Sequence, residues 1–314
     1  PMENHLGEIW SLFHFLMPGF LGSQQRFKEV FRNPIEKQGD TARLAQLSAR
    51  VTPFMLRRTK ALVAGELPPK VESVMSVELT GAQADLYETI RLGMEKTVRE
   101  ALQSKGLAKS QITILDALLK LRQVCCHPAL VPLDAAKTVK TSAKLEQLMA
   151  LLPEMLAEGR RILLFSQFTS MLTLIEAELK KRGLPWVKLT GQSVKRDAII
   201  EQFTSGQVPL FLISLKAGGV GLNLPQADTV IHFDPWWNPA VEDQATDRAH
   251  RIGQRQSVWV IKLVAQGTIE EKILALQERK AQLAGSLYSG AASRKEPMFT
   301  EGDLAELLQP LSLS

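Results

Sequence analysis

The sequence contains only two cysteines in 314 residues, and the two are neighbours, Cys125 and Cys126. Adjacent cysteines rarely form a disulfide, because the bridge strains the peptide between them. Together with His127 they do not match the ligand spacing of a zinc site, and no second pair of ligands occurs. We therefore predict two buried, reduced thiols, a cytosolic environment and no metal site.

Long apolar runs and strong charge are missing too. No stretch reaches the about 20 apolar residues that cross a bilayer, and the N-terminus lacks the profile of a signal peptide, so we expect no membrane partner. Hydrophobic residues make up 45% of the chain, which is typical of globular proteins. The net charge of +5 is compatible with a polyanionic partner. The chain begins with Pro1 and not with methionine, so we expect it to be a truncated or processed piece.

Strand-like and helical segments alternate from residue 142 onward. Strands are expected at 161–165, 186–189, 210–214, 229–233 and 258–264, and helices at 142–157, 169–182, 194–203, 239–250 and 268–283. This alternation predicts an α/β fold in which helices cover both faces of a parallel sheet. In such sheets the functional residues lie at the carboxyl ends of the strands.

The residues before 142 indicate a mainly helical region. Helices are expected at 9–16, 25–31, 41–50, 81–105 and 110–124, and an imperfect strand-like run at 71–79. Thr80 is predicted to cap the helix that begins at Gly81. Beyond the last sheet helix, a small, polar tail at 285–296 precedes a short helix at 299–308.

Three polar residues near His250 form a candidate phosphate site. Gln244, Arg248 and Arg251 are spaced to project from one face of the expected helix. Two guanidinium groups and an amide form an array of donors suited to phosphate oxygens. A solvated helix face with an ion pair to Asp243 or Asp247 is the alternative. The position after an apolar strand favours the phosphate site, because substrates bind at that edge.

The segment Asp243-Gln-Ala-Thr-Asp-Arg-Ala-His-Arg-Ile-Gly-Gln254 resembles the last helicase motif of the Swi/Snf-type ATPases, a branch of the superfamily-two motors. In that family two arginines neutralise charge on the transferred phosphoryl group. The resemblance implies a RecA-like sheet, with Arg251 and Arg248 as arginine fingers and Gln244 as a supporting contact.

The segment Ser214-Leu-Lys-Ala-Gly-Gly-Val-Gly-Leu-Asn-Leu224 resembles the preceding motif of the family. Glycines at 218, 219 and 221 let the backbone approach a ligand, and their N–H groups can form an anion nest. A glycine-rich turn between a strand and a helix is the structural alternative. The resemblance implies that Gly221 and Asn223 face the nucleotide, and that Ser214, Lys216 and Ala217 lie toward the DNA backbone.

Three further segments resemble family motifs that touch DNA. Ser166-Gln-Phe-Thr169 follows the first strand, and the resemblance assigns DNA contacts to Ser166, Gln167 and Thr169; Thr169 can also cap the helix. Leu189-Thr-Gly191 implies contacts from Thr190 and Arg196, although the family usually has Asp at position 190. In Asp234-Pro-Trp-Trp-Asn-Pro239, Trp236 is interpreted as a packing ring and Trp237 as the ring that couples DNA to the nucleotide cleft.

The resemblance extends over the whole chain. Residues 1–13 resemble the end of the first motor lobe, 53–60 the brace between the lobes, and 121–128 the end of a helical protrusion. We therefore divide the chain into 1–60, the remnant of lobe one with the brace; 61–141, the connector and protrusion; 142–284, the RecA-like second lobe; and 285–314, a tail with a short helix.

Two motifs of such motors do not occur in the sequence. There is no Gly-x-x-x-x-Gly-Lys-Ser/Thr loop to hold a triphosphate and no Asp-Glu-x-His box to hold magnesium. In the family both belong to lobe one, so ATP and Mg²⁺ are expected to be held mainly by residues outside this chain. We expect the chain alone to be inactive as an ATPase, since arginine fingers act only on an assembled site.

Three functions remain open from the sequence. The first is the second lobe of a monomeric motor that moves along double-stranded DNA and remodels DNA-bound protein complexes, in the bacterial nucleoid or, for a eukaryotic source, the nucleus; we favour the bacterial source. The second is a strand-separating helicase of the same superfamily. The third is a DNA-binding module without a motor role. The brace, the protrusion and the Asp-Pro-Trp-Trp segment favour the first.

Overall fold

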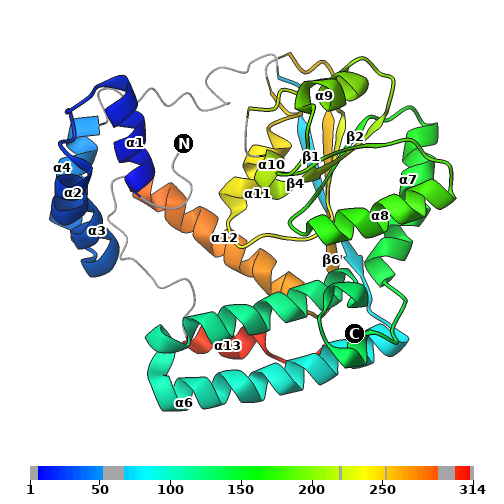
Figure 1. The fold of residues 1–314 in the computed structure, drawn as a ribbon, viewed down its shortest axis with the longest axis horizontal. Coiled ribbons are helices and arrows are strands. Elements are labelled where there is room, and N and C mark those ends of the chain that lie inside the picture. The colour runs from blue at the N-terminus through cyan, green and yellow to red at the C-terminus, as the bar shows by residue number, and fades with distance from the viewer. Residues whose placement is uncertain (1–5, 52–66, 219–220, 252, 289–300, 312–314) are drawn as a thin grey trace. The chain divides into compact units, whose positions relative to one another are not determined.

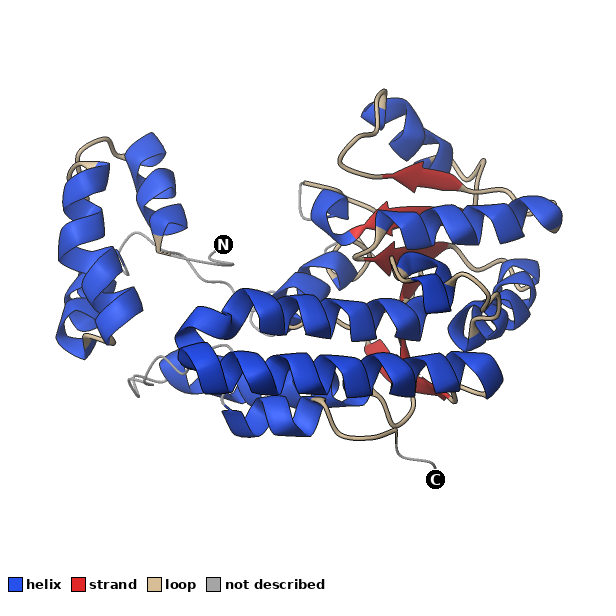
Figure 2. Cartoon of the chain, turned by 60° about the horizontal axis from the view of Figure 1, so that its bottom comes forward, coloured by secondary structure: helices blue, strands red, loops and turns tan. Residues whose placement is uncertain are grey.

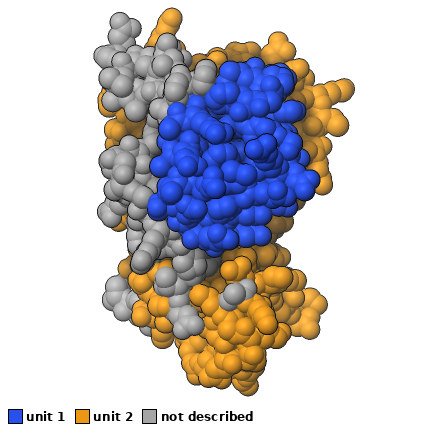
Figure 3. Space-filling model, turned by 90° about the vertical axis from the view of Figure 1, so that its left-hand side faces the viewer, with its two compact units in different colours: residues 1–65, 281–300 blue, residues 66–280, 301–314 orange. Residues whose placement is uncertain are grey.

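The structure, a computed structural model, describes residues 6–51, 67–218, 221–251, 253–288 and 301–311. The chain divides into two compact units, one of residues 1–65 with 281–300 and the other of residues 66–280 with 301–314 (Figure 3). The predicted brace at 53–60 lies outside the described residues, as do 289–300 of the predicted tail. No helix among the described residues is long and apolar enough to span a bilayer.

The first unit is helical, as predicted. Its helices are α1 (Gly7–Leu16), α2 (Gln24–Phe27), the π-helical turn η1 (Lys28–Arg32), α3 (Asn33–Gln38) and α4 (Thr41–Val51). The helix expected at 25–31 therefore continues through η1 and α3, and ends where Gly39 adopts a left-handed conformation with φ of 66°. The unit has its own core, formed by Leu6, Ile9, Phe13, Leu21, Phe27, Phe31, Leu47 and Val51.

The second unit contains the predicted parallel sheet. Six parallel strands follow the order β1-β6-β5-β2-β4-β3. They are β1 (Lys70–Val77), β2 (Ile162–Ser166), β3 (Val187–Leu189), β4 (Leu210–Ser214), β5 (Thr229–His232) and β6 (Val258–Ala265). The α/β, RecA-like class is confirmed, and the run at 71–79 proves to be the edge strand β1, paired with β6 along eight residues.

Helices cover both faces of the sheet (Figures 1 and 2). They are α7 (Ala143–Ala157), α8 (Thr169–Lys181), α9 (Arg196–Thr204), α10 (Leu215–Gly218), α11 (Pro239–Thr246) and α12 (Ile269–Tyr288). Successive strand residues alternate between two cores: Leu163 and Phe165 pack with α9 and α11, whereas Ile162 and Leu164 pack with α7 and α8. This alternation is the period of two that a strand imposes.

The predicted helical arm is α6 (Gly81–Cys126), which is interrupted at Gly106 with φ of 71°. Its two halves run back along each other (Figures 1 and 2), and the Gln83 amide donates to the Val124 carbonyl across their ends (2.9 Å). Thr80 is the N-cap residue of this helix, as predicted, although its side chain makes no capping hydrogen bond among the described residues. The short turns η3 (Pro128–Leu130) and η4 (Asp134–Ala136) follow.

The last helix, α13 (Glu301–Leu307), returns to the helical arm. Nη1 of Arg91 donates to the Leu308 carbonyl (3.0 Å), and the Leu311 N–H donates to Glu88 (2.7 Å). Helix α12 extends to Tyr288, five residues beyond its predicted end, so residues 285–288 are helical. The sheet, the arm and α13 thus belong to one compact unit.

Candidate functional site

Most predicted site residues lie at the carboxyl edge of the sheet. Strand β2 ends at Ser166 and β4 at Ser214, and these two serines are partners in the register of neighbouring strands. Strand β5 ends at His232, shortly before Asp234 and the two tryptophans. Because all six strands are parallel, the segments that follow them emerge at the same edge.

The Ser166 hydroxyl is bonded within the chain. It donates to Oδ1 of Asp234 (2.5 Å) and accepts from the Phe168 N–H (3.1 Å). The Gln167 N–H donates to the other Asp234 oxygen (3.1 Å). Both Ser166 and Asp234 are buried, whereas Thr169 is exposed. The N-cap of α8 is Phe168 without a side-chain cap, so the predicted capping by Thr169 is wrong.

The two tryptophans after β5 differ in burial. Trp237 is only 5% exposed, whereas Trp236 is partly exposed and packs against the sheet core from its margin. The Trp236 N–H donates to Glu242 (3.1 Å). Trp236 therefore packs as expected, Trp237 is the more buried of the two rings, and the coupling role of Trp237 stays a prediction.

The glycine-rich segment after β4 folds tightly against the sheet. The Ser214 hydroxyl accepts from the Ala217 N–H (3.3 Å), and both residues are buried. A Cβ on Gly218 would lie 2.8 Å from the Phe165 ring, which explains the requirement for glycine there. Gly221 has φ of 56°. Of the three residues expected to face DNA in this segment, only Lys216 is exposed.

Thr190 and Arg196 flank the turn between β3 and α9. The Thr190 N–H donates to Ser193 Oγ (2.8 Å), and the Thr190 hydroxyl accepts from the Gln192 N–H (3.3 Å). Nη2 of Arg196 donates to the Ala217 carbonyl (3.4 Å). This contact joins the turn to the glycine-rich segment.

The arginine segment is not the continuous helix that was predicted. Helix α11 ends at Thr246, and Arg248 and Arg251 lie in the turns that follow, so the common helix face with Gln244 is wrong. The reason is tertiary bonding: the Arg248 carbonyl accepts from the Leu224 N–H (2.9 Å), and the Ala249 carbonyl accepts from the Gln254 amide (3.0 Å). These carbonyls are drawn out of the helical pattern.

The same turns bring the arginine segment onto the glycine-rich segment. Nη1 of Arg251 donates to the Leu222 carbonyl (3.3 Å), one residue before the exposed Asn223. The Gln254 amide donates to the Ala227 carbonyl (2.7 Å). Two motifs that are separated by residues 225–242 in the sequence thus lie side by side, although Arg248 and Arg251 lie in turns.

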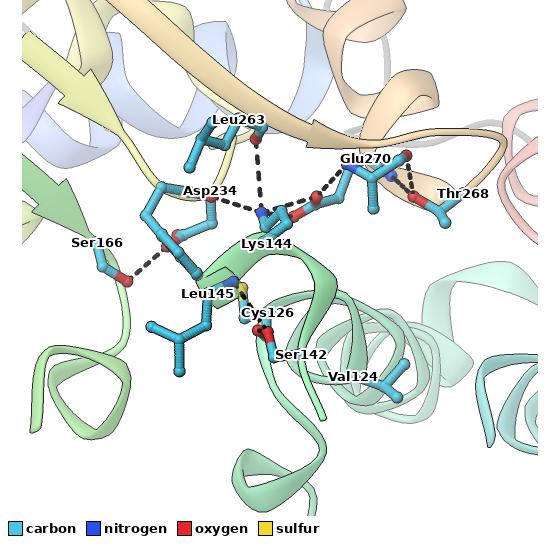
Figure 4. A network of polar contacts seen from close by, with 12 residues as sticks. Val124, Cys126, Ser142, Lys144, Leu145, Ser166, Asp234, Leu263, Thr268 and Glu270 are labelled. Atoms are coloured by element: carbon cyan, nitrogen blue, oxygen red, sulfur yellow. Dashed lines mark hydrogen bonds and ion pairs between the residues drawn. The ribbon is translucent and has the colours of Figure 1, made fainter. Parts of the chain in front are cut away.

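A buried ion pair that the sequence analysis missed supports this edge (Figure 4). Nζ of Lys144 donates to both oxygens of Glu270 (2.8 and 2.9 Å) and to the Phe233 carbonyl, the peptide before Asp234. Burial acts to lower the pKa of Lys144, but the Glu270 carboxylate outweighs it, so the net pKa is raised. Lys144 lies four residues before Leu148 on the apolar face of α7. A charged residue on an apolar helix face is the sequence signal that could have predicted a buried ion pair.

His232 and the two cysteines are buried groups without a direct place in the site. Nε2 of His232 lies 3.0 Å from the Thr246 hydroxyl at the end of α11, and burial lowers the pKa of His232 to about 3. Cys125 and Cys126 are buried and free, as predicted, and Nδ1 of His127 accepts from the Ala129 N–H (3.0 Å). Burial raises the pKa of both thiols.

The donors at this edge fit an anion. Guanidinium groups at Arg248 and Arg251 and a glycine with a left-handed backbone at Gly221 are groups that bind phosphate oxygens. The buried carboxylates near the edge, Asp234 and Glu270, already accept hydrogen bonds from within the chain. The donors at this edge thus suit a phosphate or another anion.

Two protein families match the chain. The SNF2-related domain matches residues 1–130, and the helicase conserved C-terminal domain matches residues 143–253. The putative ATP-dependent helicase/translocase YwqA of Bacillus subtilis is 40% identical over 321 residues, covering all of this chain and 34% of the relative. The TATA-binding protein-associated factor MOT1 of Saccharomyces cerevisiae is 33% identical, with 99% of this chain and 20% of the relative covered. The chain spans about a third or less of the length of these relatives.

Solved structures agree with the family matches. The SWI2/SNF2 ATPase core of Sulfolobus solfataricus in complex with dsDNA is 38% identical with a TM-score of 0.62, covering 100% of this chain and 65% of that one. The C-terminal domain of the S. solfataricus SWI2/SNF2 ATPase is 33% identical with a TM-score of 0.59, covering 78% of this chain and all of that domain. The chain belongs to the SWI2/SNF2 family of ATPases.

Proposed function

We propose that the chain is the C-terminal part of a DNA-dependent ATPase that moves along double-stranded DNA and remodels protein–DNA complexes. The observation that carries the proposal is the hydrogen bond from Arg251 to the Leu222 carbonyl, which fixes the arginine segment beside Gly221 and Asn223. The guanidinium groups of Arg248 and Arg251 form one side of a nucleotide site. The other groups of that site come from residues outside this chain.

The roles at this site follow from charge. ATP with Mg²⁺ supplies the phosphoryl group when it is bound, held mainly by residues that this chain lacks. Arg251 and Arg248 stabilise negative charge that develops on the transferred group. Gln244 is a supporting polar contact, and Gly221 and Asn223 face the nucleotide.

The residues proposed to contact DNA fall into an exposed group and a buried group. Thr169 and Lys216 are exposed, and Gln167, Thr190 and Arg196 are partly exposed, so these five offer groups to a DNA backbone. Ser166, Ser214, Ala217 and Trp237 are buried and shape the loops that carry the exposed groups. The similarity to a SWI2/SNF2 core that was solved with dsDNA supports a duplex as the ligand. Binding is expected to weaken steeply with salt, because phosphate contacts dominate it.

The remaining features of the proposal concern partners. We propose a monomer that acts on proteins bound to the duplex, and the similarity to the TATA-binding protein-associated factor MOT1 supports a DNA-bound protein as the target. A forked duplex distinguishes this motor from a strand-separating helicase: the motor consumes ATP on the substrate without releasing a strand.

The test compares two neighbouring arginines in the full-length protein. Arg251→Ala is expected to lower DNA-stimulated ATP turnover by roughly 10³-fold or more, the usual effect of losing an arginine finger, while duplex binding persists. Arg255→Ala, at an exposed position four residues on, is the matched control and is expected to retain turnover. Equal turnover in Arg251→Ala and wild type would refute the assignment.

A further inference from the structure

Arg122, near the end of α6, is buried among aromatic rings. It is 5% exposed, and its guanidinium carbon lies 5.0 Å from the centre of the Trp236 ring, 5.1 Å from Trp237 and 6.0 Å from Phe168. One Nη donates to the side-chain oxygen of Gln167. Its Nε is buried without a hydrogen-bond partner among the described residues. A cation is thus surrounded by two loops of the carboxyl edge.

A second buried arginine on the same helix shows what is unusual about Arg122. Arg91 is 4% exposed and forms ion pairs with Glu88 and Glu95, both at 3.0 Å. Within the described part of the chain, Arg122 has no carboxylate at ion-pair distance. Accordingly, hydrogen bonding to Glu88 raises the pKa of Arg91, whereas burial lowers the pKa of Arg122 and Asp234 offsets only part of this.

An arginine in this setting is unfavourable for stability alone. A buried charge without a good partner loses solvation, and replacing such a charge by an apolar side chain is often neutral or stabilising. Arginine nevertheless has a geometry that apolar residues and lysine lack. The face of its planar guanidinium can stack on an aromatic ring while an N–H at its edge donates a hydrogen bond. Arg122 uses both properties, toward the tryptophans and toward Gln167.

We propose that Arg122 is a positioning residue that joins the helical arm to the two loops facing DNA, so that duplex binding at these loops is transmitted to α6. The inference rests on the proposed function, because it takes Gln167 and the loop of Trp236 and Trp237 as part of the duplex-binding edge. Arg122 holds the Gln167 side chain at the start of α8 and the tryptophan pair after β5 in one fixed relation. It does so from a helix whose other half carries α13.

The test uses three variants of the full-length protein: Arg122→Met, Arg122→Lys and Arg91→Met. The readouts are the ratio of DNA-stimulated to DNA-independent ATP turnover, the duplex concentration for half-maximal stimulation and the midpoint of thermal unfolding. Arg122→Met is expected to lower the ratio, or raise that concentration, by about tenfold, within the range of coupling between sites. Arg122→Lys is expected to restore only part of the lost stimulation, because lysine keeps the positive charge but lacks the planar guanidinium.

Arg91→Met is the matched control, because it removes an equally buried arginine from the same helix. It is expected to lower the midpoint of unfolding at least as much as Arg122→Met and to leave the turnover ratio unchanged. Unchanged stimulation in Arg122→Met, or an equal loss in Arg91→Met, would overturn the role of Arg122 while the motor function stands. Wild-type protein without any stimulation by DNA would overturn the proposed function and the coupling with it.

Discussion

The ammonium of Lys144 and the carboxylate of Glu270 form an ion pair of 2.8 Å in which the side chains are 0% and 1% exposed. It joins the first turn of α7 to the first turn of α12, and the same ammonium holds the Phe233 carbonyl beside Asp234. Asp234 in turn fixes Ser166 and the Gln167 backbone. The geometry of the carboxyl edge therefore depends on a buried cation whose hydrogen bonds, among the described residues, go to Glu270 and to the Phe233 and Leu263 carbonyls.

Lys144→Met is expected to destabilise the chain by about 3–5 kcal/mol, because Glu270 is left as an uncompensated buried charge. Combining it with Glu270→Gln removes that charge and is expected to restore a large part of the loss. The measurement is urea unfolding followed by circular dichroism. Lys137→Met, which breaks the exposed pair with Asp134, is the control and is expected to change stability little. Similar losses from the two lysine variants would contradict the assignment.

Gly218→Ala is expected to destabilise the chain by about 1–3 kcal/mol, because the added methyl group meets the Phe165 ring at 2.8 Å and the side chain of Ile213 at 3.5 Å. Gly93→Ala is the matched control: it lies inside α6, and its Cβ meets nothing within 4 Å. That change is expected to stabilise the chain by about 0.5–1 kcal/mol, as alanine does in a helix interior. Thermal unfolding of both variants checks the opposite signs, and a shared sign would count against the packing argument.

His232 is expected to make stability fall in acid. Its folded pKa of about 3 lies below the ordinary value of 6.5, so its contribution is complete above pH 6.5 and is lost as the pH falls toward 3. Since one pKa unit corresponds to about 1.4 kcal/mol, the loss amounts to roughly 4–5 kcal/mol over this interval. His232→Gln, which keeps an amide near Thr246 without a titrating group, is expected to show a shallower decline in unfolding free energy. Parallel curves for the two proteins would disprove this role.

The sheet was predictable from the sequence because its strands are short apolar runs between amphipathic helices. Leu163 and Phe165 face one core and Ile162 and Leu164 the other, so a strand buried on both faces reads as continuous apolar sequence. The place of β1 in the sheet was not predictable. Its partner β6 lies almost 190 residues away, and no local pattern in 71–79 identifies that pairing.

The candidate site was predictable in its motifs and only partly in its geometry. Local periodicity favoured a helix through His250, but hydrogen bonds from Leu224 and Gln254 take the carbonyls of Arg248 and Ala249. Such long-range bonds leave no trace in the spacing of apolar residues. Arg122 was likewise hidden: it stands in a helical run, and only the fold brings Trp236 and Trp237 to it.

The edge position of β1 also bears on how the second unit can be isolated. Strand β6 is paired with β5 on one side and along its whole length with β1 on the other, from Lys70 opposite Val258 to Val77 opposite Ala265. A recombinant piece cut at residue 142 would strip β1 away and make the more buried, apolar β6 the edge strand, with the N–H and C=O groups on its β1-facing side open. Open edges recruit strands from neighbouring molecules. Expression boundaries drawn before Lys70 therefore protect against self-association that a boundary at the start of α7 would invite.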